Sequence, residues 1–136
     1  MRQGTQAQQR KRVGSKMAIK KFTSKKNRAA IYERDNMECC YCGKHTVKYS
    51  VEDWKLRSSD VATLDHIVSQ WAIAQTCESD AEFRRAVADP KNLVLVCNSC
   101  NASKQETELY IWCAAKGYDY AAILARIATR TGKHNV

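Results

Sequence analysis

Four cysteines in two Cys-x2-Cys pairs are the feature that most constrains the fold of this 136-residue chain. Cys39 and Cys42 form the first pair, and Cys97 and Cys100 form the second. Paired thiolates with this spacing are typical of a structural zinc site, which closes a tetrahedron around the ion and contributes to folding. The seven cysteines are an odd number and no secretion signal is evident, which disfavours a disulfide framework. We therefore predict a four-cysteine zinc site.

The other three cysteines are predicted to have no metal role. Cys40 competes with Cys39 for a place in the first pair, but Cys40-x-Cys42 is a poor spacing for a metal knuckle. Cys77 and Cys113 stand alone in the sequence. Because free cysteine is among the most buried residue types, we expect both in the hydrophobic core.

The net charge of +9 is concentrated near the N-terminus. Residues 1–28 contain ten basic side chains and no acidic one, whereas the rest of the chain is nearly neutral. An acid-free basic run repels itself, and its natural partner is a polyanion. We predict that residues 1–27 form a nucleic-acid-binding arm, with a solubilising tail or a transit peptide as alternatives. The predicted contacts in this region are Arg10, Lys11, Arg12, Lys20, Lys21, Lys25, Lys26 and Arg28.

Length and composition indicate one small globular domain. Hydrophobic residues make up 44% of the chain, an ordinary proportion for a globular protein. No apolar run approaches the roughly 20 residues of a membrane-spanning helix, and no signal peptide is evident. We therefore expect a cytoplasmic protein with no membrane partner.

Periodicity and turn signals predict a small α+β fold built around the metal. Gly43 is expected to supply the positive φ of a metal knuckle, and Gly117 is expected to end a helix. The three tryptophans, at positions 54, 71 and 112, are expected in the core rather than in a base-stacking platform. The predicted helices cover 25–35, 80–87, 100–117 and 120–130, and the predicted strands cover 47–51, 61–68 and 93–96.

Three polar segments go beyond what a plain zinc module needs. Asp65 and His66 are adjacent within an apolar run. Asn92 opens the next such run, and Asn101 follows the second cysteine pair. Adjacent side chains of a strand point to opposite faces, so Asp65 and His66 serve one site only where the strand ends or bends. Imidazole suits a general base near neutral pH, whereas carboxylate and amide oxygens suit Mg²⁺ or Mn²⁺ better than zinc.

These residues, framed by the two cysteine pairs, make the chain resemble the zinc-stabilised branch of the HNH endonucleases. The lead-in Arg28-x2-Ile31-x2-Arg34-Asp35-Asn36-x2-Cys39 also matches this family, and the resemblance covers roughly residues 28–106. One position departs from the pattern, because Asn101 stands where the family name has its last histidine. Active members with Asn at this position are known, including the HNH domains of CRISPR nucleases, so this departure does not argue against catalysis.

The resemblance implies a ββα-metal (His-Me finger) core stapled by the zinc site, with flanking helices. It implies that His66 is the general base, that Asp65 and Asn101 hold a catalytic Mg²⁺ or Mn²⁺, and that Asn92 braces the loop carrying the base. Lys104, one turn after Asn101, is then expected to contact a phosphate. Residues 28–106 would form the nuclease core, and residues 107–136 a C-terminal helical extension.

Three of these residues also have a purely structural interpretation. His66 fits a buried histidine whose hydrogen bonds are satisfied. Asn101 fits a cap at the start of a helix, and Lys104 fits a solvated surface residue.

The sequence thus predicts a metal-dependent endonuclease that hydrolyses DNA, of a phage or mobile-element type that would act in the host-cell cytoplasm. One such site cuts one strand at a time, so a double-strand break needs a homodimer or two encounters. The alternatives are a catalytically silent zinc-containing nucleic-acid-binding module and an accessory subunit of a larger DNA-processing machine.

Overall fold

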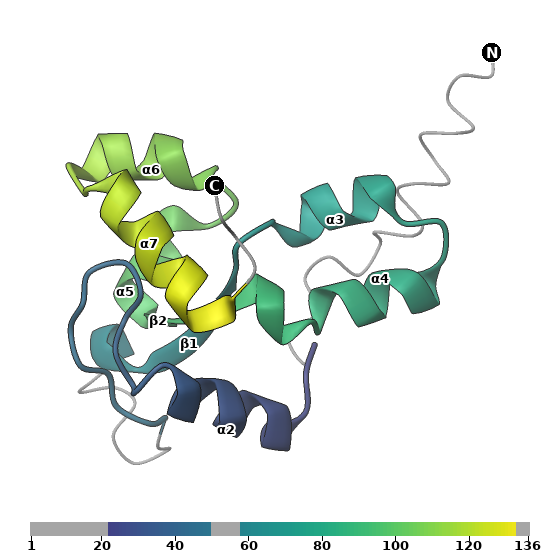
Figure 1. Cartoon of the computed structure of the whole chain (residues 1–136), viewed down its shortest axis with the longest axis horizontal. Helices are drawn as coiled ribbons and strands as arrows, with labels where there is room; N and C mark the ends of the chain where they lie inside the picture. The colour runs from purple at the N-terminus through teal and green to yellow at the C-terminus, as the bar shows by residue number, and fades with distance from the viewer. Residues whose placement is uncertain (1–21, 50–57, 133–136) are drawn as a thin grey trace.

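The computed structural model describes residues 22–49 and 58–132, and within them it has six α-helices and one two-stranded sheet. The sheet lies among the helices, with α3 and α4 to one side and the C-terminal helices to the other (Figure 1). The prediction of a small α+β fold is confirmed. The helices are α2 (Lys25–Arg34), α3 (Gln70–Thr76), α4 (Asp80–Val87), α5 (Asn98–Lys104), α6 (Leu109–Lys116) and α7 (Tyr120–Thr131), and the strands are β1 (Ala62–His66) and β2 (Leu93–Cys97).

The two strands pair antiparallel, in a register that places His66 opposite Leu93. β2 is buried along its whole length, as expected for an unbroken apolar run covered on both faces. In β1, Thr63 and Asp65 share one face, and Leu64 and His66 share the other. β1 ends at His66, so the Asp65–His66 pair lies at the end of a strand.

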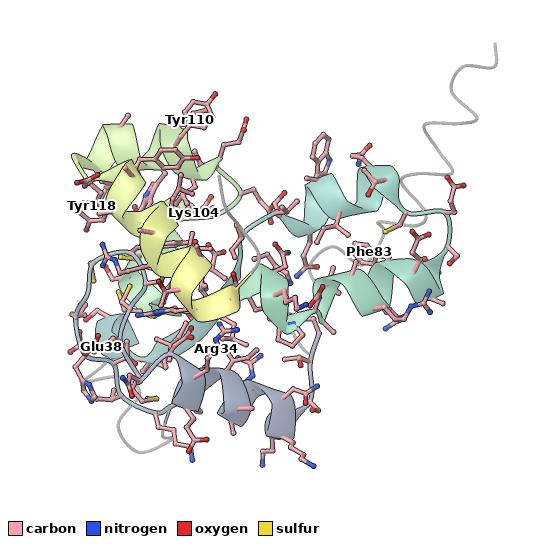
Figure 2. All side chains as sticks on the ribbon, viewed as in Figure 1. Arg34, Glu38, Phe83, Lys104, Tyr110 and Tyr118 are labelled. Carbon is pink, nitrogen blue, oxygen red and sulfur yellow. The ribbon has the colours of Figure 1, made fainter. Side chains whose placement is uncertain are left out.

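Hydrophobic clusters cover both faces of the sheet. The largest joins the cysteine pairs and β2 to α6 and α7 through Trp112, Ile123 and Ile127. A second cluster joins α2 to the sheet through Ile31. A third holds α3 against α4 around Phe83, which Figure 2 shows between the two helices. The C-terminal helices thus share one core with the cysteine region. This core contains residues from before and after the predicted boundary at residue 106.

A buried carboxylate ties α2 to β2. Asp35, the C-terminal cap of α2, accepts hydrogen bonds from the Arg34 side chain at 2.6 Å and from the Leu95 backbone N–H at 2.8 Å. Arg34 also donates to the backbone carbonyl of Leu93 at 2.7 Å. Arg130 of α7 lies 3.5 Å from the same carboxylate. The segment that leads into the first cysteine pair is therefore fixed to the strand that ends in the second pair.

The prediction of one helix over 100–117 is wrong, because α5 and α6 are separated by residues 105–108. Gln105 has a positive φ of 50° and ends α5. In a continuous helix Lys104 and Leu109 would point about 140° apart, since each residue turns the helix by about 100°. The break allows both side chains to be buried. Gly117 ends α6 in the left-handed conformation, as predicted.

The strand predicted over 47–51 is also not formed in its described part. Val47 makes one isolated bridge to Val61, and Tyr49 is exposed. Val51 lies outside the described residues.

Helix α3 was not expected from the sequence, and it begins at Ser69, whose hydroxyl accepts from the Ala72 N–H. It carries Trp71, which is 55% exposed, so the expectation of a core position is wrong for this residue. Trp112 is buried as expected, and Trp54 lies outside the described residues. The helices predicted over 25–35, 80–87 and 120–130 are confirmed within one residue at each end. No helix in the described ranges has the length and apolar character needed to span a bilayer.

Candidate functional site

The four sulfurs of the predicted metal site lie together. The Sγ atoms of Cys39, Cys42, Cys97 and Cys100 are all within 4.8 Å of one another, and those of Cys42 and Cys97 are 3.9 Å apart. Sulfurs that each lie about 2.3 Å from a tetrahedral ion are about 3.8 Å from one another. The cluster could therefore hold a structural metal such as zinc after only a small contraction.

Backbone N–H groups point at these sulfurs. Cys39 Sγ accepts from the N–H groups of Tyr41 and Cys42, and Cys97 Sγ accepts from the Cys100 N–H, all at 3.4 Å. A hydrogen bond with the Cys100 thiol is the main cause that lowers the pKa of Cys39. The same hydrogen bond raises the pKa of Cys100, and burial raises the pKa of Cys97, so without a metal the thiolate form is favoured at Cys39 alone of these three. The thiolate is the form of cysteine that binds metals.

The remaining cysteines are buried, and they lie outside this cluster. Burial raises the pKa of Cys40 to about 11, and its thiol lies among apolar side chains. Cys113 is buried against the C-terminal helices, and Cys77 is buried between α3 and α4. Cys39 rather than Cys40 therefore belongs to the metal cluster, and Gly43 has the predicted positive φ, 82°, just after it.

Asp65 is the centre of a buried polar cluster between β1 and α5. Its Oδ2 accepts from the Tyr41 hydroxyl at 2.6 Å and lies 3.0 Å from the Lys104 ammonium. Burial, assisted by the Asp65 charge, raises the pKa of Tyr41, so this phenol keeps its proton and donates it. Within the described chain no hydrogen bond is made to Asp65 Oδ1.

Lys104 is only 3% exposed and lies in the interior beneath the C-terminal helices (Figure 2). The solvated-surface interpretation of Lys104 is therefore wrong. Its ammonium is paired with Asp65, so its charge is already compensated.

His66 lies on the opposite face of β1 and is 7% exposed. Its Nε2 is 2.8 Å from the backbone carbonyl oxygen of Val87, at the end of α4. Because a carbonyl only accepts, Nε2 carries the proton of the neutral ring, and Nδ1 keeps a lone pair. Burial is the main cause that lowers the pKa of His66. The ring is therefore neutral at pH 7, with one nitrogen satisfied and the other able to accept a proton.

Two side chains, those of Phe22 and Arg28, lie one after the other over the His66 ring and form the histidine stack. The Phe22 ring centroid is 4.5 Å from the His66 centroid, and the Arg28 guanidinium lies 5.5 Å from the Phe22 centroid. Arg28 donates to the Tyr32 hydroxyl at 3.3 Å, and that hydroxyl donates to the Ala62 carbonyl at 3.1 Å. Residues at the start of α2 thus hold the histidine ring against β1.

Asn92 ties the segment after His66 to the start of β2. Its Oδ1 accepts from the Val68 N–H at 2.8 Å, and its Nδ2 donates to the Val68 carbonyl at 2.9 Å. The Asn92 backbone carbonyl also accepts from the Ile67 N–H at 2.9 Å. These three hydrogen bonds brace the chain directly after the predicted base.

Asn101 lies inside α5, whose N-terminal cap is Cys97, so the helix-cap interpretation of Asn101 is wrong. Its Nδ2 donates to Thr63 Oγ1 at 3.0 Å and to the Leu64 carbonyl at 3.4 Å. Thr63 is on the same face of β1 as Asp65. The amide is thus held beside that face by its nitrogen, and its Oδ1 is the atom left to bind a cation.

The predicted nucleic-acid contacts are only partly within the described residues. Lys25 and Lys26 are exposed in the first turn of α2, and Arg28 is half-buried against Phe22. Outside the described residues lie Arg10, Lys11, Arg12, Lys20 and Lys21.

Sequence reasoning did not identify the partners of Asp65 and Asn101. Thr63 precedes Asp65 by two residues, which places both on one strand face and was a usable signal. Lys104 follows Asn101 by three residues, which places both on one helix face. Tyr41 offered no signal except its position inside the first cysteine pair.

Comparison of the chain with protein-family models, curated proteins and solved structures finds no match.

Proposed function

We propose that this protein is a metal-dependent HNH-type endonuclease that hydrolyses DNA phosphodiester bonds. The observation that carries the proposal is that Asn101 of α5 lies on the Asp65 face of β1, while His66 ends the same strand on its opposite face. β1 and β2 pair antiparallel and α5 follows β2 directly, as in a ββα-metal core, but here α3 and α4 lie between the two strands in the chain. A carboxylate, an amide oxygen and a neutral imidazole together are the groups that metal-assisted hydrolysis requires.

The proposed structural ion is zinc, held by the four cysteines. Four thiolates satisfy a tetrahedral ion completely and leave no open position for a substrate. This ion would therefore stabilise the fold and fix the start of α5, which carries Asn101 and begins within the second cysteine pair.

The residues on the Asp65 face of β1 fit a Mg²⁺ or Mn²⁺ ion. Tyr41 and Lys104 hold Oδ2 of Asp65, so Oδ1 is the oxygen that would bind the ion together with Oδ1 of Asn101. Hard oxygen ligands that fill only two positions leave the others to water and phosphate. When bound, such an ion supplies Lewis-acid stabilisation of the charge that develops on the phosphate and the leaving oxygen.

In this proposal His66 accepts the proton of the attacking water at Nδ1. The Val87 carbonyl holds Nε2–H and stabilises the positive ring that forms after proton transfer. Phe22 and Asn92 keep the ring and the following segment in place. A positioned general base contributes about 10²–10⁴ in rate.

One observation favours a second candidate, a catalytically silent zinc module that binds nucleic acid through its basic arm. The Lys104 ammonium already neutralises the Asp65 carboxylate, so this carboxylate does not need a divalent ion to balance its charge.

Nicking of supercoiled plasmid distinguishes the two candidates. The wild-type protein is expected to relax the plasmid with Mg²⁺ and to leave it intact without a divalent ion. His66→Ala should slow nicking about 10²–10⁴-fold, whereas His45→Ala, a matched change at an exposed histidine, should not. A His66→Ala protein that is folded, zinc-loaded and as fast as the wild type would refute the endonuclease and leave the binding module.

A further inference from the structure

A groove lined by aromatic side chains lies between α3 and the C-terminal helices. Its volume is about 600 Å³, which is typical of a small-ligand site. Trp71 of α3 and Tyr110 of α6 line the groove and are 55% and 53% exposed. Tyr120 of α7 also lines it, with its ring centroid 6.3 Å from that of Tyr110. Exposed aromatic side chains gathered around one concave surface indicate a binding site.

The groove adjoins the residues of the proposed catalytic site. Lys104, whose ammonium pairs with Asp65, forms part of its wall. Ile67 and Val68, which directly follow His66, form another part. A ligand in the groove would therefore lie beside the position of the scissile phosphate.

The charges of the groove select a neutral ligand rather than a phosphate. Glu106 and Glu108 line it, and Lys104, which is already paired with Asp65, is the sole cation among the lining residues. Carboxylates repel phosphate groups but accept hydrogen bonds from amino groups. A flat aromatic ligand with amino donors at its edge satisfies the rings and the carboxylates together.

We propose that this groove binds an unpaired nucleobase of the nucleic acid substrate, stacked on Trp71 and flanked by Tyr110 and Tyr120. The inference rests on the proposed function for the nature of the substrate. It deepens that function by naming the substrate class as DNA that is single-stranded or exposes an unpaired base beside the cut. Cytosine, adenine and guanine carry an exocyclic amino group that can donate hydrogen bonds to Glu106 and Glu108, whereas thymine has no such group.

Binding of a nucleobase in the groove is tested directly by fluorescence anisotropy of two dye-labelled DNA octamers, oligodeoxycytidine (dC8) and oligothymidine (dT8). The measurement uses zinc-loaded full-length protein in Mg²⁺-free buffer. Trp71→Ala should weaken binding of dC8 by about 5- to 150-fold, the effect of losing one base–aromatic stack. Trp71→Phe should retain most of the affinity because it keeps an aromatic face. Tyr49→Ala is the matched control, since Tyr49 is equally exposed at 58% and does not line the groove. The wild type should bind dC8 more tightly than dT8.

Equal dC8 affinity of the wild type and Trp71→Ala would overturn the proposal. So would a Trp71-dependent dimer in sedimentation velocity with no effect on oligonucleotide binding, which would identify the groove as a protein interface. Equal affinity of the wild type for dC8 and dT8 would overturn the role of the two carboxylates. Plasmid nicking is scored separately. If the wild type does not nick plasmid but Trp71→Ala still weakens dC8 binding, the endonuclease proposal alone is refuted. If the wild type nicks plasmid but Trp71→Ala binds dC8 as tightly as the wild type, the groove proposal alone is refuted.

Discussion

Replacing Asn92 by alanine is expected to destabilise the protein while leaving its zinc content unchanged. The Asn92 side chain makes two hydrogen bonds with the Val68 backbone, at 2.8 and 2.9 Å, and Asn92 is 6% exposed. It touches none of the four cysteine sulfurs. The change therefore removes a brace from the segment after β1 without altering the metal cluster.

The magnitude follows from what the truncation leaves unpaired. Each hydrogen bond contributes about 0.5–1.5 kcal/mol net, whereas a buried backbone group left without a partner costs about 1–3 kcal/mol. Two fully buried groups would thus cost up to about 6 kcal/mol. Val68 is 44% exposed, so water replaces part of the lost bonding. We expect a decrease of about 2–3 kcal/mol in the free energy of unfolding.

Urea denaturation of the zinc-loaded protein, followed by circular dichroism, measures this decrease. Asn98→Ala is the matched control, because Asn98 is half-buried and its side chain makes no hydrogen bond with the described residues; its effect should stay within about 0.5 kcal/mol. Asn92→Asp buries an unpaired carboxylate and sets one of its oxygens against the Val68 carbonyl, so it should be at least as destabilised as Asn92→Ala. If Asn92→Ala and Asn98→Ala have the same free energy of unfolding, the brace is not a stabilising element.

Three further predictions concern the metal, the histidine stack and the arm. Purified protein should retain close to one zinc per chain after dialysis, and strong chelation should unfold it; a zinc-free protein with an unchanged melting profile would contradict the cysteine site. Phe22→Ala removes the ring 4.5 Å from His66 and should lower kcat for plasmid nicking with little change in KM, and Phe22→Tyr should restore it; a rise in KM alone would mean that Phe22 contacts DNA instead. Removing residues 1–21 should make the plot of log binding constant against log salt concentration less steep, by about 0.9 in slope per lost phosphate contact, and should preserve turnover at saturating DNA. Loss of turnover at saturating DNA would place the arm in the active site.

The features that could be predicted from the sequence are those whose signals are local. The spacing of the cysteine pairs indicated the metal cluster, and the poor spacing of Cys40 excluded it from the cluster. Gly43 and Gly117 marked positive-φ positions, which few other residues adopt easily. An apolar run starting at Leu93 predicted a fully buried strand. In each case, a few neighbouring residues determine the outcome.

The features that could not be predicted depend on residues far apart in the chain. The break after Lys104 allows both Lys104 and Leu109 to be buried, Lys104 in its ion pair with Asp65, and no residue of the segment 100–117 signals that pair. The orientation of the His66 ring depends on the Val87 carbonyl and on Phe22, which come from two different segments. The expectation of a core position for Trp71 failed because the buried side of α3 packs against α4, whereas Trp71 lines the groove.

The ion pair of Lys104 and Asp65 also predicts how a divalent ion acts on stability. Both side chains are buried, so Lys104→Met leaves an unpaired carboxylate inside the protein, at a cost of about 3–5 kcal/mol. The same change removes the positive charge that opposes a second cation near Asp65. If Asp65 binds Mg²⁺, the ion should therefore raise the melting temperature of Lys104→Met more than that of the wild type.

The double variant Asp65→Asn with Lys104→Met provides the control, since it removes both charges and keeps the side-chain volumes similar. It should fold at least as well as Lys104→Met, because replacing both members of a buried ion pair costs less than removing one. Mg²⁺ should not change its melting temperature, because the carboxylate is absent. Equal Mg²⁺ stabilisation of all three proteins, measured by differential scanning fluorimetry, would mean that the ion binds elsewhere and that the Asp65 cluster is structural.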